Sequence, residues 1–164
     1  CSRDVPEVIA ELGGKGIRTK NGHSFMKQIM AETGAVFAGE HSGHYYFADN
    51  YRADSGLIAT MGVLGEMCHT GKSLSQMREP LERYASSGEI NTTVDDIHAV
   101  IERIALDYSS HSQDRVDGLT VDCGSWWFNV RASNTEPLLR LNLEASTRDE
   151  CDTHVVELLA SITA

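Results

Sequence analysis

Residues 138–145 constrain the fold of this chain most, because from Leu139 onward their side chains alternate between apolar and polar. The alternation runs through Leu139, Arg140, Leu141, Asn142, Leu143 and Glu144. A period of two places the leucines on one face of a β-strand and the polar residues on the other. The C-terminal half is therefore predicted to contain a sheet with one covered face.

The neighbouring patterns predict a small α+β domain over residues 95–164. Further strands are expected at residues 119–122 and 126–131, and a helix is expected where apolar residues recur at helical spacing from Ile97 to Tyr108. Thr147 and Glu150 form a capping box that opens a final helix. The predicted domain has an antiparallel sheet and two helices, and Trp126 and Trp127 are expected in packing roles.

The first 84 residues alternate between predicted helices and strands, which is typical of an α/β domain with a mixed sheet. Helices are expected at residues 5–12, 24–33, 57–68 and 74–84, the third of them buried and the last one bent or stopped by Pro80. Short strands are expected at residues 16–19 and 35–38. Residues 85–94 are expected to form a hinge or linker at 85–88, followed by the first strand of the next domain.

The composition favours a globular protein without a nucleic-acid or membrane partner. A formal net charge of −10 opposes nonspecific binding to nucleic acid and to anionic membranes. Apolar runs are shorter than the roughly 20 residues that span a bilayer, and a cytoplasmic location is expected. Cys1, Cys68, Cys123 and Cys151 are far apart, so reduced and mostly buried thiols are expected rather than a zinc site or a disulfide framework.

A glycine-punctuated loop at residues 39–47 gathers the first candidate functional side chains. Glu40, Ser42 and His44 lie within five residues of one another, with His41 between them. A glutamate accepts hydrogen bonds from adjacent sugar hydroxyls, a serine can donate or accept, and glycines allow close backbone approach. The pattern fits a site for a polyol, and it also fits an ordinary polar loop before a strand.

A second polar loop, residues 131–137, lies between two predicted strands. Arg131 offers a planar fork to phosphate oxygens, and Ser133, Asn134 and Thr135 add neutral donors. The pattern fits a phosphate-binding loop, and it also fits a solvated hairpin turn ended by Pro137. A weaker signal is the segment 18–24, where Lys20 precedes a glycine and a predicted helix.

In this order, these segments resemble the phosphohexose mutase (phosphoglucomutase/phosphomannomutase) family, and most of all its bacterial phosphomannomutase type. Residues 39–44 resemble the family's sugar-recognition motif, residues 131–137 its phosphate-binding loop, and residues 22–25 the segment that precedes the sugar motif. The resemblance implies that the chain contains the third domain of that fold, without its start, followed by the fourth. Residues 53–56 depart from the pattern, because many relatives have two consecutive aspartates where this chain has Asp54 and Ser55.

The resemblance also implies roles for individual residues. Glu40 and Ser42 would bind the sugar through its 3- and 4-hydroxyls, and the non-reacting phosphate would be held by Arg131, Ser133, Asn134 and Thr135. Lys20 and His44 would belong to the catalytic cleft, His44 near the reacting hydroxyl. Mannose and glucose agree at carbons 3 and 4, so activity toward the 1- and 6-phosphates of both sugars is expected.

The implied reaction interconverts hexose 6-phosphate and hexose 1-phosphate through a bisphosphorylated sugar and a phosphoserine. The family's serine loop and its Mg²⁺-binding loop belong to its first two domains and are not found in this sequence. Those domains are therefore expected partners, they are expected to hold Mg²⁺, and the chain alone is expected to be inactive. A phosphoglucosamine mutase and a noncatalytic phosphosugar-binding module are the alternatives.

Overall fold

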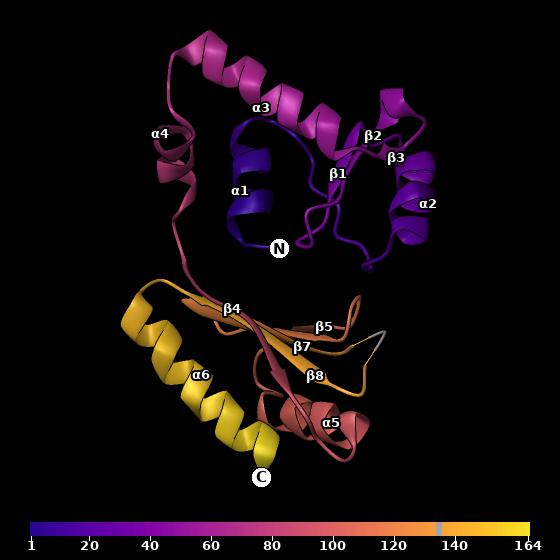
Figure 1. Ribbon diagram of the computed structural model, residues 1–164. Helices are drawn as coiled ribbons and strands as arrows, with labels where there is room; N and C mark the ends of the chain where they lie inside the picture. The colour runs from indigo at the N-terminus through magenta and orange to yellow at the C-terminus, as the bar shows by residue number, and fades with distance from the viewer. Residues whose placement is uncertain (134–135) are drawn as a thin grey trace. The chain divides into compact units, whose positions relative to one another are not determined.

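The computed structural model describes residues 1–133 and 136–164 of the chain. They form two compact units (Figure 1). The first unit contains residues 1 and 5–82, and the second contains residues 2–4 and 83–164. The two units correspond to an α/β region followed by an α+β region, which confirms the predicted fold class. The expected mixed sheet differs in one respect: the strand pairs described in the first unit are all antiparallel.

The first unit contains a small antiparallel sheet with strand order β1-β2-β3. Its elements are α1 (Asp4–Glu11), α2 (His23–Thr33), β1 (Phe37–Gly39), β2 (Tyr45–Phe47), β3 (Ala53–Asp54), α3 (Gly56–Thr70), α4 (Leu74–Arg78) and short 3₁₀ turns at Ala48–Asn50 and Glu79–Leu81. Its buried core cluster consists of Met26, Met30 and Tyr46. The core therefore joins one face of α2 to the central strand.

The helix predictions in this unit are largely confirmed. Gly34 and Gly71 end α2 and α3 in the left-handed conformation, with φ of 71° and 67°. The 3₁₀ turn Glu79–Leu81, which contains Pro80, ends the last helix as expected.

Two expectations for the first unit are wrong. Residues 16–19 form no strand, because no described segment pairs with them. The helix α3 is not buried: none of its residues is buried, and Leu57 and Met61 are strongly exposed. Its apolar composition predicts a covered helix, but this unit offers too few elements to cover it.

The second unit is built on a five-stranded sheet with strand order β4-β8-β7-β6-β5. Its elements are β4 (Ala85–Thr92), α5 (Ile97–Asp107), β5 (Ser112–Asp114), β6 (Leu119–Asp122), β7 (Trp126–Ala132), β8 (Leu139–Ala145) and α6 (Arg148–Thr163). Each neighbouring pair of strands is antiparallel. The short strand β5 at the edge of the sheet was not predicted from the sequence.

Helices α5 and α6 both cover the same face of this sheet (Figure 1). The leucines of β8 are buried beneath them, as the alternating pattern predicted. The opposite face carries polar cross-strand pairs, including Asn129 with Asn142 and Arg131 with Arg140. Trp126 is buried in the core, and the Trp127 Nε1 donates to Glu144 at 3.0 Å, so both tryptophans pack as expected.

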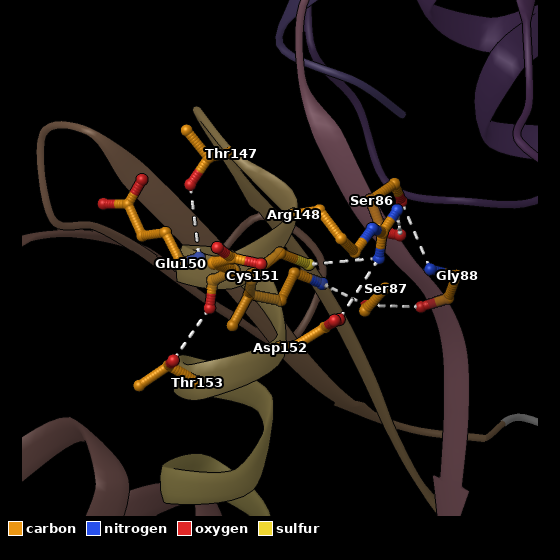
Figure 2. Close-up of polar contacts among 11 residues, drawn as sticks. Ser86, Ser87, Gly88, Thr147, Arg148, Glu150, Cys151, Asp152 and Thr153 are labelled. Carbon is orange, nitrogen blue, oxygen red and sulfur yellow. Dashed lines mark hydrogen bonds and ion pairs between the residues drawn. The ribbon is translucent and has the colours of Figure 1, made fainter.

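Residues 85–88, expected as a linker, form the start of β4, and that expectation is wrong. The strand bulges between Ser86 and Glu89, where Gly88 has a φ of 68°. Figure 2 shows how the bulge is fixed: the Gly88 amide donates to Ser86 Oγ at 3.2 Å, and the Arg148 Nη2 donates to the Ser86 carbonyl at 3.0 Å. Small residues that resemble a linker in sequence serve here as local hydrogen-bond partners.

The cysteine expectation is partly wrong. All four thiols are free, but only Cys151 is buried, Cys123 is half-buried, and Cys1 and Cys68 are exposed. Burial raises the pKa of the Cys123 thiol to about 11. Cys123 is therefore poorly reactive, because the thiolate is the nucleophilic form.

Candidate functional site

The hairpin between β1 and β2 presents the residues of the predicted sugar motif. Its turn is closed by two backbone hydrogen bonds, from the Gly43 amide to the Glu40 carbonyl at 3.0 Å and from the Glu40 amide to the His44 carbonyl at 2.9 Å. Gly43 has a φ of 85°, which favours glycine at this position. The tight turn brings Glu40, Ser42 and His44 to one end of the hairpin.

A cavity of about 390 Å³ lies against this end of the hairpin. It is lined by Gly22, His23, Lys27, Glu40, Ser42, His44, Tyr46 and Asp54. The structure therefore brings together the predicted site residues Glu40, Ser42 and His44, all from one loop. Residues of α2 and β3 form other parts of the cavity wall. Lys20 is not among the lining residues; its Nζ lies 5.3 Å from the centroid of the Phe25 ring.

Two hydroxyl groups orient the Glu40 carboxylate. Ser42 Oγ donates to Oε2 at 3.2 Å, and the Tyr46 hydroxyl donates to Oε1 at 2.9 Å. Burial, together with the hydrogen bond to Glu40, raises the pKa of Tyr46 to about 12, so the phenol stays a proton donor. The carboxylate is thus held at the cavity by a residue of the core, and each oxygen retains capacity to accept another hydrogen bond.

His44 and Asp54 form a close pair beside Glu40. The His44 Nδ1 lies 2.6 Å from Asp54 Oδ2, and the Tyr45 amide donates to Asp54 Oδ1 at 2.9 Å. The hydrogen bond and charge of Asp54 raise the pKa of His44 above 6.5, and the same bond lowers the pKa of Asp54 below 3.8. With Nδ1 engaged, Nε2 is the ring nitrogen left to meet a ligand.

Five of the eight lining residues were not predicted as site residues: Gly22, His23, Lys27, Tyr46 and Asp54. His23 and Lys27 are separated by one turn of α2, so the i, i+4 rule for helices puts them on one face. Asp54 was noted in the sequence only as part of the departure at residues 53–56 from the family pattern. Its pairing with His44 depends on the register of β2 with β3, which the sequence does not state.

The second predicted loop joins β7 to β8. The Ser133 amide donates to the Leu138 carbonyl at 2.8 Å, which continues the ladder beyond the strands. The Arg131 Nη2 donates to Glu89 Oε2 at 3.2 Å, and the Arg131 side chain is only 14% exposed. Asn134 and Thr135 lie outside the described residues. Arg131 and Ser133 therefore lie at the end of the β7–β8 pair, and the Glu89 carboxylate orients the Arg131 guanidinium.

Two searches of the described residues bear on cofactors and membranes. Within residues 1–133 and 136–164, no three histidine, cysteine, aspartate or glutamate side chains gather in a way that could hold a metal ion. Of the helices described, none is long and apolar enough to cross a membrane.

Two family models match the chain in succession. The model described as "Phosphoglucomutase/phosphomannomutase, alpha/beta/alpha domain III" matches residues 1–84. The model described as "Phosphoglucomutase/phosphomannomutase, C-terminal domain" matches residues 89–161.

Individual relatives agree with these matches. A phosphomannomutase of Methanocaldococcus jannaschii is 41% identical over 96% of this chain and 35% of its own length. A phosphomannomutase of Escherichia coli K12 is 36% identical over 88% of this chain and 32% of its own length. The chain thus spans about a third of the length of these relatives.

Solved structures show the same fold. A crystal structure of a phosphoglucomutase/phosphomannomutase family protein from Burkholderia thailandensis matches with a TM-score of 0.80 and 28% identity, over 99% of this chain and 36% of that one. An Aspergillus fumigatus N-acetylphosphoglucosamine mutase, solved with glucose 1,6-bisphosphate, matches with a TM-score of 0.65 and 15% identity over 95% of this chain and 35% of that one. The two domain models show that the chain belongs to the phosphoglucomutase/phosphomannomutase family, of which it carries domain III and the C-terminal domain.

Proposed function

We propose that this chain is the sugar- and phosphate-binding part of a mutase that interconverts hexose 6-phosphates and hexose 1-phosphates. The observation that carries the proposal is the Glu40 carboxylate, oriented by Ser42 and Tyr46 at a cavity beside His44. The reaction would pass through a bisphosphorylated sugar, with the phosphoserine supplied by preceding domains. The family's relatives named phosphomannomutase support this reaction class.

The proposed sugar contacts are made by Glu40 and Ser42. A carboxylate can accept hydrogen bonds from two adjacent hydroxyls, which fits the 3- and 4-hydroxyls of a hexose. Glucose and mannose differ at carbon 2 and agree at carbons 3 and 4. A site that reads only carbons 3 and 4 accepts both sugars, so the proposed substrates are the 1- and 6-phosphates of mannose and glucose.

The proposed phosphate contacts are made by the loop after β7, through Arg131, Ser133, Asn134 and Thr135. Arg131 supplies a planar charged fork, which suits phosphate oxygens better than a single point charge does. The loop would hold the phosphate that does not react in a given half of the cycle. We assign this role to the second unit, which includes β4, and the sugar role to the first unit.

His44 is the proposed residue for proton transfer at the reacting hydroxyl. Asp54 fixes the ring through Nδ1 and raises the pKa of His44, which favours the protonated ring with a proton at Nε2. Lys20 would add positive charge near the cleft. Neither residue replaces the phosphoserine, so turnover requires the preceding domains.

Mg²⁺ is proposed to bind outside this chain. The described residues hold no cluster suited to a metal ion, and the proposed roles of Glu40, Arg131 and His44 use no metal. When bound in the preceding domains, the ion would neutralise charge on the transferring phosphoryl group. A cytoplasmic enzyme is proposed, in keeping with its phosphorylated substrates.

A chimera tests the proposal. We would join this chain to the preceding domains of the Methanocaldococcus jannaschii phosphomannomutase and measure conversion of mannose 1-phosphate. Glu40→Gln removes the carboxylate charge at nearly constant shape, and we expect kcat/KM to fall about a hundredfold, since hydrogen bonds to charged groups contribute about 1.5–3 kcal/mol each. His41→Gln, a neighbouring substitution outside the cavity lining, is the matched control.

The outcomes separate the candidate functions. Equal kinetics for Glu40→Gln and His41→Gln would contradict the sugar assignment. An active chimera that prefers glucosamine 1-phosphate would favour a phosphoglucosamine mutase. Calorimetric binding of glucose 1-phosphate by this chain, with no turnover in the chimera, would favour a noncatalytic phosphosugar-binding module.

A further inference from the structure

Lys27 is a charged residue of the cavity wall that the proposed function leaves without a role. It lies in α2, one turn after His23, and lines the same cavity as Glu40, His44 and Asp54. Within residues 1–133 and 136–164, its ammonium group makes no hydrogen bond and no close ion pair. The ammonium is therefore available to a ligand that enters the cavity.

The charges of the cavity wall indicate which kind of ligand Lys27 suits. Glu40 and Asp54 contribute two carboxylates, and the protonated form of His44, which Asp54 favours, offsets one of them. The two donors that hold Glu40 are uncharged hydroxyls, so they leave its negative charge in place. With His23 neutral, Lys27 supplies the charge that offsets the second carboxylate. Without Lys27 the wall would be net negative and would repel a phosphorylated sugar.

The charge of Lys27 also acts on the pair at which proton transfer is proposed. The hydrogen bond with His44 is the largest cause of the lowered pKa of Asp54, and the charge of Lys27 adds to it. A lysine has a flexible four-carbon stem, so an ammonium near Asp54 can turn toward a group held beside His44. Gly22 and His23 bring the N-terminal end of α2 to the same wall, where the helix dipole also favours an anionic group.

We propose that Lys27 binds the phosphoryl group that reacts, next to His44. The inference rests on the proposed function, in which the sugar passes through a bisphosphorylated form and His44 acts at the reacting hydroxyl. A phosphoryl group on that hydroxyl would enter the cavity at His44, where the ammonium of Lys27 is free to contact its oxygens. The ligand is a hexose bisphosphate, and the phosphate concerned is not the one assigned to the β7–β8 loop.

The sugar is part of what Lys27 requires. A single exposed ammonium binds free phosphate very weakly, because water screens the pair. Lys27 acts once Glu40 and Ser42 hold the sugar, since the phosphoryl group is then kept beside it at a high effective concentration. Inorganic phosphate alone should therefore leave the signals of the cavity residues unchanged.

Two ligands that differ by one phosphoryl group test the proposal on this chain. We would titrate it with glucose 1-phosphate and with glucose 1,6-bisphosphate, and follow the Glu40 and Ser42 amides by NMR. Lys27→Met removes the charge and keeps the apolar stem. We expect it to raise the dissociation constant of the bisphosphate about tenfold and that of glucose 1-phosphate less than twofold. Lys27→Arg keeps the charge and should stay within about threefold of the natural sequence for both ligands.

Lys72→Met is the matched control, because it removes the same charge from an exposed residue of the first unit outside the cavity lining. We expect it to change neither dissociation constant more than about twofold. Equal losses for the two ligands in Lys27→Met would overturn the proposal, and so would equal effects of Lys27→Met and Lys72→Met. If neither ligand shifts the Glu40 and Ser42 amides of the natural sequence, the proposed sugar site fails and this proposal fails with it.

A measurement on the unsubstituted chain separates direct contact from a general effect of charge. The Cε–H signals of Lys27 should shift with glucose 1,6-bisphosphate and stay in place with glucose 1-phosphate. Those of Lys72 should move with neither ligand. Lys27 signals that move equally with both ligands would place the ammonium against the sugar rather than the added phosphoryl group, and the proposal would be wrong.

Discussion

The two units of this chain differ sharply in how much core supports their functional residues. In the second unit, two helices and the sheet share one large buried cluster, which includes Phe128, Val130 and Leu141. In the first unit, the buried cluster contains Met26, Met30 and Tyr46. The hairpin that carries Arg131 therefore packs on a large core, and the hairpin that carries Glu40 packs on a small one.

The difference teaches that the two proposed sites are held by different means. The Arg131 side chain is held by the Glu89 carboxylate, and neither residue belongs to the core cluster. Glu40 instead accepts a hydrogen bond from Tyr46, which is itself a core residue. Stability and ligand contact are consequently coupled at Glu40 and separate at Arg131.

The largest expected effect is in the second unit. Phe128 is fully buried, with its ring centroid 5.0 Å from that of Tyr108, so Phe128→Ala should lower the free energy of unfolding by about 3–5 kcal/mol. Both tryptophans belong to this unit, so tryptophan fluorescence in denaturant follows its unfolding. Val156→Ala, at a residue 67% exposed, is the control, and a loss below about 1 kcal/mol for Phe128→Ala would remove the contrast between the two cores.

A smaller effect is expected from Met30→Ala in the first unit. Met30 is 1% exposed, and its truncation should cost about 2–3 kcal/mol. Because the cluster is small, we expect the first unit to open without the second. Hydrogen exchange would then speed up at the Tyr46 amide while the Val130 amide stays protected, and simultaneous loss at both amides would show that the units unfold as one.

Tyr46→Phe should have a more modest effect and would sharpen the comparison at Glu40. It removes one hydroxyl from a hydrogen bond with a partly exposed carboxylate, and we expect a loss of about 1–2 kcal/mol, confined to the first unit. Tyr45→Phe, on the exposed face of the same strand, should cost less than about 0.5 kcal/mol. Equal losses for the two substitutions, measured by exchange of the β2 amides, would mean that the Glu40 bond contributes nothing.

The smallest effect is a dependence on pH in the first unit. The His44–Asp54 contact stabilises the fold where His44 is protonated and Asp54 ionised. Since the pKa of His44 is raised above 6.5, the contact is lost as pH rises through that raised value. Since the pKa of Asp54 is lowered below 3.8, it is also lost as pH falls through that lowered value.

An NMR titration of His44 measures the first of these limits. We expect a pKa above 6.5 that returns toward 6.5 in Asp54→Asn and stays raised in the control Asp49→Asn. An unchanged His44 titration in Asp54→Asn would show that the pair does not form in solution.

Much of the second unit could be predicted from the sequence because its patterns are local. The alternation of β8 and the Thr147 cap of α6 depend only on residues within a few positions of one another. The start of β4 could not be predicted, because Ser86 and Gly88 are typical of linkers and act as strand residues only with β8 and Arg148 beside them. The exposure of α3 likewise depends on which elements are present to cover it, not on its own composition.

The candidate site divides in the same way. Glu40, Ser42 and His44 are close in sequence, so one turn brings them together, and the motif was enough to find them. Asp54, Lys27 and Glu89 meet their partners through strand register, helix packing and a bulge, all of which depend on the folded structure. Lys20 was predicted as a cleft residue from the family resemblance, but it is not among the residues that line the cavity.

The division of roles between the two units is the central claim, and two NMR titrations of this chain test it most directly. Inorganic phosphate should shift the amides of Arg131 and Ser133 and leave those of Glu40 and Ser42 unchanged. Glucose 1-phosphate should shift both sets. If glucose 1-phosphate moves only the signals that phosphate moves, the cavity at Glu40 does not read the sugar, and the account is contradicted.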